Sequence, residues 1–274
     1  MSQVDDLGDR MKRYERAETD RRFMNYAPVI ARMDGRGFSR WTAGLPRPFD
    51  RRLSEVMIEV TRKLVAEVGA RIGYTQSDEI TLVFLIEDIK QSMMFDGKAQ
   101  KLCSVLASLT TSLFIVECLK QGGELGNRAL QAPHFDSRVF QVPTKFEAAN
   151  AVLWREQDAA KNAVSMAART FYPHADLQGK SGPQMQEMMF AKGQNFNEYA
   201  AFFKRGSFLQ TRTVEEALTP DVLARLQDKN ITSETIFTRR RVERIEMPIF
   251  SRVINREDVI FEGAEPLLQQ DEEI

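Results

Sequence analysis

Cysteine and histidine are scarce in this chain of 274 residues, which contains two of each. Cys103 and Cys118 both fall in an apolar segment of helical spacing, so a disulfide framework is not expected, and two small core residues in a reducing compartment are the simpler interpretation. His134 and His174 each lie beside a proline. With the scattered cysteines they make no zinc-ligand spacing, and their context does not indicate histidine-based nucleophilic catalysis.

An excess of charge of one sign is missing as well, because 38 Lys+Arg against 39 Asp+Glu give a formal net charge of -1. No whole-molecule field attracts polyanions, so contacts with nucleic acid must come from local basic patches.

The chain shows no apolar run that approaches the roughly 18 residues needed to span a bilayer. Its charged N-terminal residues lack the apolar core of a signal peptide. We therefore expect a cytoplasmic protein without membrane contact.

Apolar periodicity predicts an ordered series of helices and strands. The expected elements are a surface helix in the first two dozen residues, a buried strand over 27–33, a helix capped by Asp50 and ending near Gly69, two strands over 72–76 and 80–86 joined by an acidic turn, a helix over 98–119, a strand over 138–142, helices over 146–171 and 185–190, and strands over 202–211 and 238–250. The first part of this series predicts an α+β fold, a ferredoxin-like antiparallel sheet with helices on one face, which is the layout of a polymerase palm. We expect a palm-like catalytic domain over 1–145. Residues 146–274 are expected to form a C-terminal α/β extension that completes the same globular unit.

Three carboxylates stand where predicted strands end. Asp34 closes the first strand, and Asp78 and Glu79 lie at the tip of the hairpin. In the predicted sheet they face one another across neighbouring strands, where like charges repel without a cation. Mg²⁺ prefers carboxylate oxygens, water and substrate phosphates, and paired ions about 3.5–4 Å apart serve phosphoryl transfer. Gly35 and Gly37 allow the backbone to approach a triphosphate; ordinary solvated turns are the alternative interpretation.

Two segments resemble motifs of the tRNA-His guanylyltransferase-like family. Residues 32–38, Arg-Met-Asp-Gly-Arg-Gly-Phe, resemble the family's Arg-Leu-Asp-Gly-Arg-x-Phe, and residues 74–79 resemble its Tyr-x-Gln-Ser-Asp-Glu. Shorter similar segments follow in the same order at 135–139, 154–158, 177–179 and 204–206. The ordered set covers about two thirds of the chain and is far more specific than any single motif.

The resemblance implies an enzyme, a nucleotidyltransferase that extends the 5′ end of tRNA in the 3′-to-5′ direction. In such enzymes ATP adenylylates a 5′-monophosphate on the tRNA, and the 3′-hydroxyl of an incoming nucleotide then displaces AMP. The resemblance also implies tRNA, ATP, GTP and other NTPs as partners, two Mg²⁺ ions per active site as cofactor, and a homo-oligomer, a tetramer arranged as a dimer of dimers. Residues 146–274 would contribute RNA contacts.

Carried over by position, the resemblance implies roles for single residues. Asp34, the carbonyl of Gly35 and Asp78 would hold the two Mg²⁺ ions, and Glu79 would support them as the third catalytic residue. The nucleotide would be bound by Arg32, Gly35, Arg36, Gly37, Phe38, Arg47, Asp50 and Ser77, and Lys98 and Lys101 are further nucleotide-binding candidates on physical grounds, outside the family motifs. RNA would be bound by Arg138, Asn162, Lys204 and Arg205, with the basic run 239–241 as a further candidate. Lys98 and Lys101 also stand in the first turn of a helix, where the dipole disfavours cations, so an anion is expected nearby, although a solvated face would be an ordinary alternative.

One segment departs from the family pattern. Members that add guanosine to tRNA-His carry His-Ile-Asn-Asn-Leu-Tyr-Asn, whereas residues 160–166 here read Ala-Lys-Asn-Ala-Val-Ser-Met and keep only Asn162. This favours the Thg1-like branch, which resembles template-dependent repair enzymes acting on 5′-truncated tRNA. The alternatives are a tRNA-His-specific guanylyltransferase that adds one G at position -1, a palm-type nucleotide cyclase using the same metal carboxylates, and a non-catalytic RNA-binding module.

Overall fold

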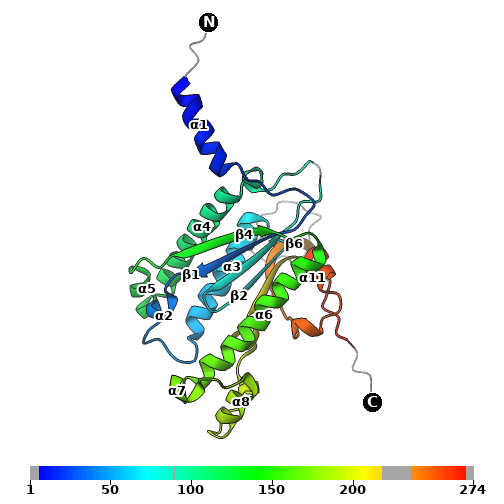
Figure 1. Cartoon of the computed structure of the whole chain (residues 1–274). Helices are drawn as coiled ribbons and strands as arrows, with labels where there is room; N and C mark the ends of the chain where they lie inside the picture. Colours follow the sequence, from blue (N-terminus) through cyan, green and yellow to red (C-terminus); the bar gives the residue numbers. More distant parts are fainter. Residues whose placement is uncertain (1–5, 89, 218–235, 270–274) are drawn as a thin grey trace.

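The protein is built around a six-stranded antiparallel sheet, seen here in a computed structural model that describes residues 6–88, 90–217 and 236–269 (Figure 1). The strands lie in the order β4-β1-β3-β2-β5-β6. Their bounds are β1 Val29–Gly35, β2 Ile72–Gln76, β3 Glu79–Phe84, β4 Phe135–Gln141, β5 Ser207–Ala217 and β6 Ile236–Ile245. The part β4-β1-β3-β2 is the ferredoxin-like arrangement predicted from the sequence, and β5 and β6 extend it beyond β2.

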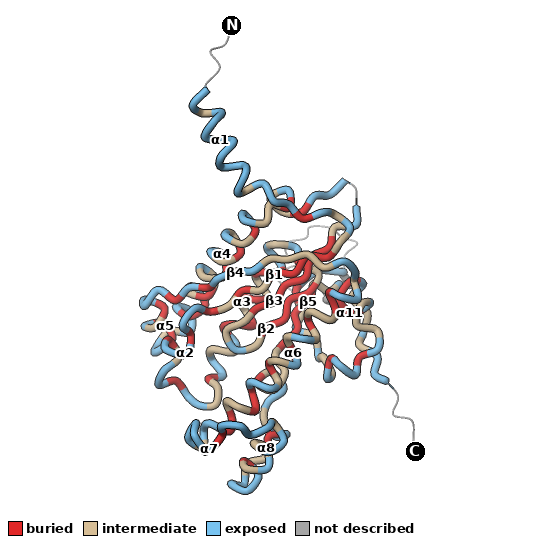
Figure 2. The backbone as a smooth tube through the Cα atoms, in the orientation of Figure 1, coloured by how far each residue is buried: buried red, intermediate tan, exposed pale blue. Residues whose placement is uncertain are grey.

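Helices pack on both faces of this sheet. Alternate residues of β1 point to opposite faces, so Ala31 and Met33 join the core beneath α3 (Arg51–Val68) and α4 (Ala99–Gln121). Ile30 joins a second core with residues of α6 (Lys145–Ala168) and α11 (Arg256–Glu262). The inner strands β1, β2 and β3 are therefore buried along most of their length (Figure 2). The palm portion has its helices on one face as predicted, and the C-terminal extension covers the other.

The ends of α3 follow the sequence signals that predicted them. The Asp50 side chain accepts a hydrogen bond from the backbone N–H of Arg52 at 2.9 Å, and Gly69 ends the helix with φ 65°. The helix then lies very close to β2, since a Cβ on Gly73 would stand 2.7 Å from Val65 Cγ2 and 2.8 Å from Thr61 Cγ2. This close approach fixes the start of the hairpin that carries Asp78.

Two predicted strands in the extension have other bounds than expected: β5 is shifted toward the C-terminus, and β6 ends earlier. The segment 202–211 begins as the short helix α9 (Ala201–Arg205) and becomes β5 only after Gly206, whose φ of 77° reverses the chain. The second strand ends at Ile245, and residues 250–252 form a 3₁₀ turn. The remaining short elements are α2 (Phe38–Trp41), α5 (Gly123–Ala129), α7 (His174–Leu177), α8 (Gly182–Phe190) and the 3₁₀ turns η1 (Met94–Gly97), η2 (Phe196–Glu198) and η3 (Phe250–Arg252).

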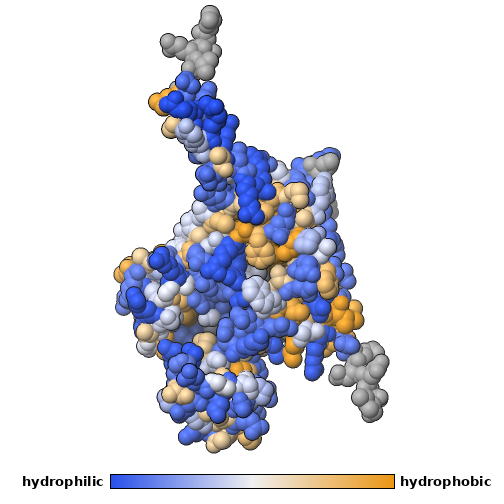
Figure 3. Space-filling view, viewed as in Figure 1, coloured by the Kyte–Doolittle hydropathy of each residue, from blue (hydrophilic) through white to orange (hydrophobic). Residues whose placement is uncertain are grey.

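The N-terminal helix α1 (Asp6–Thr19) projects from the body of the protein (Figure 1). It buries none of its residues, and its surface is mostly hydrophilic with isolated apolar side chains (Figure 3). Leu7, Met11 and Tyr14 lie at helical spacing and are exposed. These three side chains form an apolar stripe that is available for a partner. Packing on a partner would also stabilise α1, because an isolated helix of this length is marginal in water.

Helix α4 contradicts the expectation that no segment is apolar and long enough to cross a membrane. Its most apolar window has a mean hydropathy of 1.9. Serine and threonine interrupt the aliphatic residues, so the sequence shows no continuous apolar run, but these weakly polar side chains lower the mean hydropathy only slightly. One third of that window is buried in the fold, where Leu102, Leu106 and Phe114 pack into the core under the sheet. The core helix of a globular domain passes the same test of length and composition, so the finding is weak evidence for a span.

Candidate functional site

The predicted carboxylates meet at one edge of the sheet. Asp34, at the end of β1, is directly opposite Glu79 in β3 and opposite Asp136 in β4. Side chains directly opposite in antiparallel strands share a face, so these three project on the side of α6. Asp78 lies in the tight turn between β2 and β3, and its carbonyl accepts a hydrogen bond from the N–H of Gly35 at 3.1 Å. The register of β1 with its two neighbours therefore creates the acidic edge.

The electrostatics of this edge favour a bound cation. Burial, assisted by the charge of Asp34, raises the pKa of Asp78 to about 6, although the Ser77 hydroxyl donates a hydrogen bond to its carboxylate at 3.0 Å. Burial and the neighbouring Asp136 carboxylate raise the pKa of Asp34. Both shifts mean that ionised carboxylates here are poorly compensated by the protein itself.

The donor atoms at this edge fit Mg²⁺. Within the described residues no group of three or more His, Cys, Asp and Glu side chains is placed to hold a metal ion by itself. Mg²⁺ commonly takes one or two carboxylates and completes its shell with water and substrate phosphates. Asp34 and Asp78, with backbone carbonyls beside them, are an oxygen-only set of this kind.

Glu79 is held by an arginine. Arg155 of α6 donates two hydrogen bonds to the Glu79 carboxylate, at 2.6 and 2.7 Å, and a third to Asp158 at 3.0 Å. The side chains of Arg155 and Glu79 are only 11% and 15% exposed. A bidentate pair of this geometry ties α6 to β3 beside Asp34 and Asp78. Glu79 thus supports the edge through Arg155.

Two cavities open at the acidic edge and share Asp78. The first, of about 580 Å³, is polar and is lined among others by Arg32, Asp34, Glu79, Arg138, Arg155, Asn162 and Arg169. The second, of about 480 Å³, has apolar walls and is lined among others by Gly35, Gly37, Phe38, Leu45, Arg47, Phe49, Asp50, Ser77, Phe202 and Phe203. The cavities also share Gln76, Ser77, Met166 and Arg169, so a group bound in either one reaches the same carboxylate. The polar cavity suits a charged backbone, and the apolar one suits a flat ring system.

Most residues predicted to bind nucleotide or RNA line one of these cavities. Asp50 does so with its carboxylate already engaged, because it caps α3 and pairs with Arg52 at 2.6 Å. The exposed Arg36 lines neither cavity, although its backbone N–H contacts the carbonyl of His134. Asp136, Phe49 and Arg169 were not singled out in the sequence. Asp136 lies in the family-like segment 135–139 but was given no role, and the strand register is what places it opposite Asp34.

Lys98 and Lys101 are not brought to this edge. Strand β3 begins at the acidic edge and finishes at the far end of the sheet, so the helix that follows it begins at the far end too. Lys98 pairs with Asp20 at 2.9 Å, and Lys101 lies over the ring of Phe95 at 4.8 Å. The anion expected near the start of this helix is therefore a carboxylate of the protein.

Lys204 and Arg205 also lie away from the two cavities. Lys204 donates a hydrogen bond to the carbonyl of Asn197. Burial lowers the pKa of Lys204, and the charge of Arg205 lowers it further. Arg205 lines a third cavity, of about 620 Å³, with Glu156 and Arg244. The run 239–241 lies on β6, which pairs with β5 at the outer edge of the sheet.

Comparisons with known proteins identify the fold and its chemistry. The sequence profile of the family described as tRNAHis guanylyltransferase matches residues 8–143. An uncharacterised protein of Acanthamoeba polyphaga mimivirus is 31% identical over 202 residues, which are 67% of this chain and 69% of that protein. The tRNA(His) guanylyltransferase of Schizosaccharomyces pombe is 26% identical over 213 residues, covering 72% of this chain and 77% of the other.

A solved structure agrees with these sequence matches. A bacterial tRNA(His) guanylyltransferase (Thg1)-like protein in complex with ATP superposes with a TM-score of 0.76 at 30% identity, covering 93% of this chain and 99% of that one. The structure of such a bacterial protein in complex with GTP gives a TM-score of 0.68 at 31% identity, over 90% and 94% of the two chains. The acidic edge, the palm-like sheet and these matches agree, and the chain belongs to the tRNA(His) guanylyltransferase family of nucleotidyltransferases.

Proposed function

We propose that this protein repairs the 5′ end of tRNA by template-dependent addition of nucleotides in the 3′-to-5′ direction. The observation that supports this best is the junction of two different cavities at Asp78. A 5′-phosphorylated RNA end fits the polar cavity, and a nucleoside triphosphate fits the apolar one. The reacting groups would then meet over Asp34 and Asp78.

The proposed reaction has two displacements. An oxygen of the RNA 5′-monophosphate attacks the α-phosphorus of ATP, and pyrophosphate leaves. The 3′-hydroxyl of the incoming nucleotide then attacks the RNA 5′-phosphorus, and AMP leaves as the hydroxyl proton is lost. Asp34, the carbonyl of Gly35 and Asp78 would hold two Mg²⁺ ions, which neutralise charge on the phosphoryl oxygens.

The protein itself mainly positions these groups. Gly35 and Gly37 allow backbone close to the triphosphate, and Phe49 with Phe202 and Phe203 offers aromatic surface to the base. Arg32 and Arg138 offer guanidinium groups to the RNA phosphates. Phosphoryl transfer requires positioning and charge neutralisation above all.

Repair is proposed ahead of tRNA-His-specific addition because of one segment of α6. Residues 160–166 carry no histidine, and Asn162 alone matches the corresponding motif of the tRNA-His-specific members. Asn162 lines the polar cavity, on the side where the RNA end would lie. Without the imidazole, the site lacks a group that could distinguish tRNA-His from other tRNAs.

The resemblance also supports a homotetramer, to which the exposed stripe of α1 would contribute contacts.

The test is product length on defined tRNAs. Labelled full-length and 5′-shortened tRNAs are incubated with the protein, Mg²⁺, ATP and each NTP in turn. We expect the shortened tRNAs to be restored with the nucleotides that their 3′ strand specifies. Addition of a single G to tRNA-His alone would identify the specific guanylyltransferase instead, and a cyclic nucleotide formed without RNA would contradict both.

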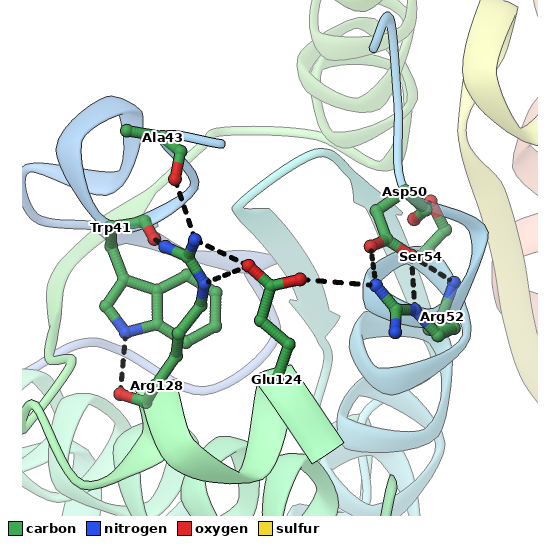
Figure 4. Close-up of polar contacts among 7 residues, drawn as sticks. All are labelled: Trp41, Ala43, Asp50, Arg52, Ser54, Glu124 and Arg128. Carbon is green, nitrogen blue, oxygen red and sulfur yellow. Dashed lines mark hydrogen bonds and ion pairs between the residues drawn. The ribbon is translucent and has the colours of Figure 1, made fainter. Parts of the chain in front are cut away.

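The loop that follows α2 supplies Leu45, Arg47 and Phe49 to the apolar cavity, and Arg128 of α5 holds it from outside. The Arg128 guanidinium donates to the carbonyls of Trp41 and Ala43, the latter at 2.7 Å, and pairs with Glu124 (Figure 4). Without this clamp the loop must be ordered when the nucleotide binds. We expect Arg128→Met to raise the KM for the nucleotide about tenfold, because ordering side chains and loops on binding costs roughly 0.5–1.5 kcal/mol per group.

Steady-state kinetics with varied nucleotide at saturating RNA checks this expectation. The matched control is Arg71→Met, which removes an arginine that donates to the carbonyl of Leu85 and pairs with Glu87. Leu85 follows the far end of β3, so this variant should keep the KM of the wild type. An unchanged KM for Arg128→Met, or equal changes in both variants, would refute a role in shaping the nucleotide cavity.

A further inference from the structure

Trp154 is a large aromatic side chain left half open to solvent beside the polar cavity. It lies on α6 and is 51% exposed. Two guanidinium groups stack on its ring: Arg155 Cζ is 4.5 Å from the ring centroid, and Arg32 Cζ is 5.5 Å away. Both arginines line the polar cavity. The indole is thus fixed to the cavity wall while much of its surface stays uncovered.

The two stacked arginines differ in how their charge is compensated. Arg155 is paired with Glu79 and Asp158. Arg32 has no carboxylate within ion-pair distance in the part of the chain that the structure describes, and in the sheet it stands directly opposite Arg138, which is paired with Asp136 at 3.6 Å. Like charges directly opposite in antiparallel strands destabilise the pair. Their juxtaposition beside the cavity is therefore suited to an anion, and a phosphate group accepts hydrogen bonds from two guanidiniums well.

An exposed aromatic ring next to two opposed arginines matches one unit of single-stranded nucleic acid, a base with its phosphate. Bases stack on aromatic side chains, and arginine adds to the attraction, while cationic groups follow the backbone. Arg32 is two residues before Asp34, which places this pair about 7 Å along the strand from the acidic edge. A base on Trp154 would therefore lie within one or two nucleotides of the reacting 5′ end.

We propose that Trp154 is a stacking platform for an unpaired base of the RNA substrate, whose adjoining phosphate lies against Arg32 and Arg138. The inference rests on the proposed function, because it requires an RNA end in the polar cavity. It assigns the triphosphate substrate to the other cavity, so Trp154 acts on RNA and not on free nucleotide. Arg155, compensated by two carboxylates, holds the indole in place.

Three variants at this position separate stacking from structure. Stacking of one base is worth about tenfold in affinity, so Trp154→Ala should weaken binding of 5′-monophosphorylated tRNA and raise its KM by about that factor. Trp154→Phe should stay within about threefold of the wild type, because it retains an aromatic face. Trp154→Leu, which is apolar without a π-face, should behave like alanine. The KM for the nucleotide and the melting temperature should change little in all three.

Intrinsic fluorescence gives a direct readout, because the chain has two tryptophans and the other is buried. Trp41 is 7% exposed and donates its indole N–H to the carbonyl of Arg128 at 3.0 Å. Addition of tRNA should quench emission and protect it from acrylamide in the wild type. Trp154→Phe should show neither effect, and ATP alone should not protect Trp154.

A matched control is Phe146→Ala, which removes another exposed aromatic ring of α6, 53% exposed, with no guanidinium stacked on it among the described residues. It should leave RNA binding unchanged. Wild-type RNA affinity in Trp154→Ala, or parallel losses of RNA affinity and melting temperature, would overturn the stacking role. If either result is found while Trp154→Ala still transfers nucleotides, only the stacking role is refuted and the proposed function stands. If the wild-type protein transfers no nucleotide to RNA, the proposed function itself is refuted.

Discussion

Asp78→Asn is expected to lower the rate constant of nucleotide transfer by about 10²- to 10³-fold or more, with little change in the affinity for tRNA. Asp78 borders both cavities, so its carboxylate is the group best placed to serve both displacements. Removing one preorganised group that stabilises charge in the transition state commonly costs this much. Asp34→Asn should act in the same direction. Single-turnover assays with a 5′-adenylylated tRNA and NTP, beside a filter-binding assay for tRNA, measure the two quantities separately.

The same substitution should not weaken the fold. Burial places the pKa of Asp78 at about 6, above its ordinary value of 3.8, so ionisation of this group reduces the free energy of unfolding as the pH rises from near 4 through 6. A neutral asparagine removes that cost. At pH 7.5 without divalent cations, Asp78→Asn should therefore be at least as stable as the wild type in urea titrations.

The control for this pair of measurements is Asp20→Asn. Asp20 is a carboxylate of the same kind that pairs with Lys98 at the far end of the sheet. Its variant should transfer nucleotides at the wild-type rate. Near-wild-type transfer by Asp78→Asn with Mg²⁺ as the only divalent cation would remove the proposed metal site, and a marked loss of stability would show that Asp78 serves the fold.

The sequence was sufficient to predict the palm-like core because its signals are local. Asp50 and Gly69 mark the two ends of α3, and an apolar run ending in Asp34 marks a buried strand, whatever else the chain does. The hairpin carrying Asp78 follows from two β-patterned runs and a short polar turn. These features alone bring the predicted catalytic carboxylates to neighbouring strands.

The parts of the site that were missed depend on contacts between distant segments. Asp136 joins the acidic edge only through the pairing of β4 with β1, and Phe202 reaches the apolar cavity only because Gly206 turns α9 into β5. Lys98 was misplaced for a related reason. Its position at a helix start was predicted correctly, but the end of the sheet at which that helix begins follows from the direction of β3.

Glu79→Gln, unlike Asp78→Asn, is expected to lower the free energy of unfolding by a large amount. The substitution leaves the guanidinium of Arg155, only 11% exposed, without its bidentate partner, and Asp158 alone remains at 3.0 Å. Breaking one side of a largely buried pair costs about 3 kcal/mol, much of it from the uncompensated charge that remains. Urea titration at pH 7.5 measures this change in the free energy of unfolding.

A double-mutant cycle assigns that loss to the pair. Glu79→Gln combined with Arg155→Met should be less destabilised than the sum of the two single variants, because the second change removes the charge stranded by the first. The control is Asp9→Asn, which breaks the pair with Lys12, where the side chains are 59% and 61% exposed, and should cost less than about 1 kcal/mol. Strict additivity in the cycle, or a Glu79→Gln variant as stable as the control, would contradict the role of Arg155 in tying α6 to the acidic edge. If the coupling is found, the cavity between α6 and the sheet owes its shape to this pair, and the two carboxylates proposed to hold Mg²⁺ are left free to do so.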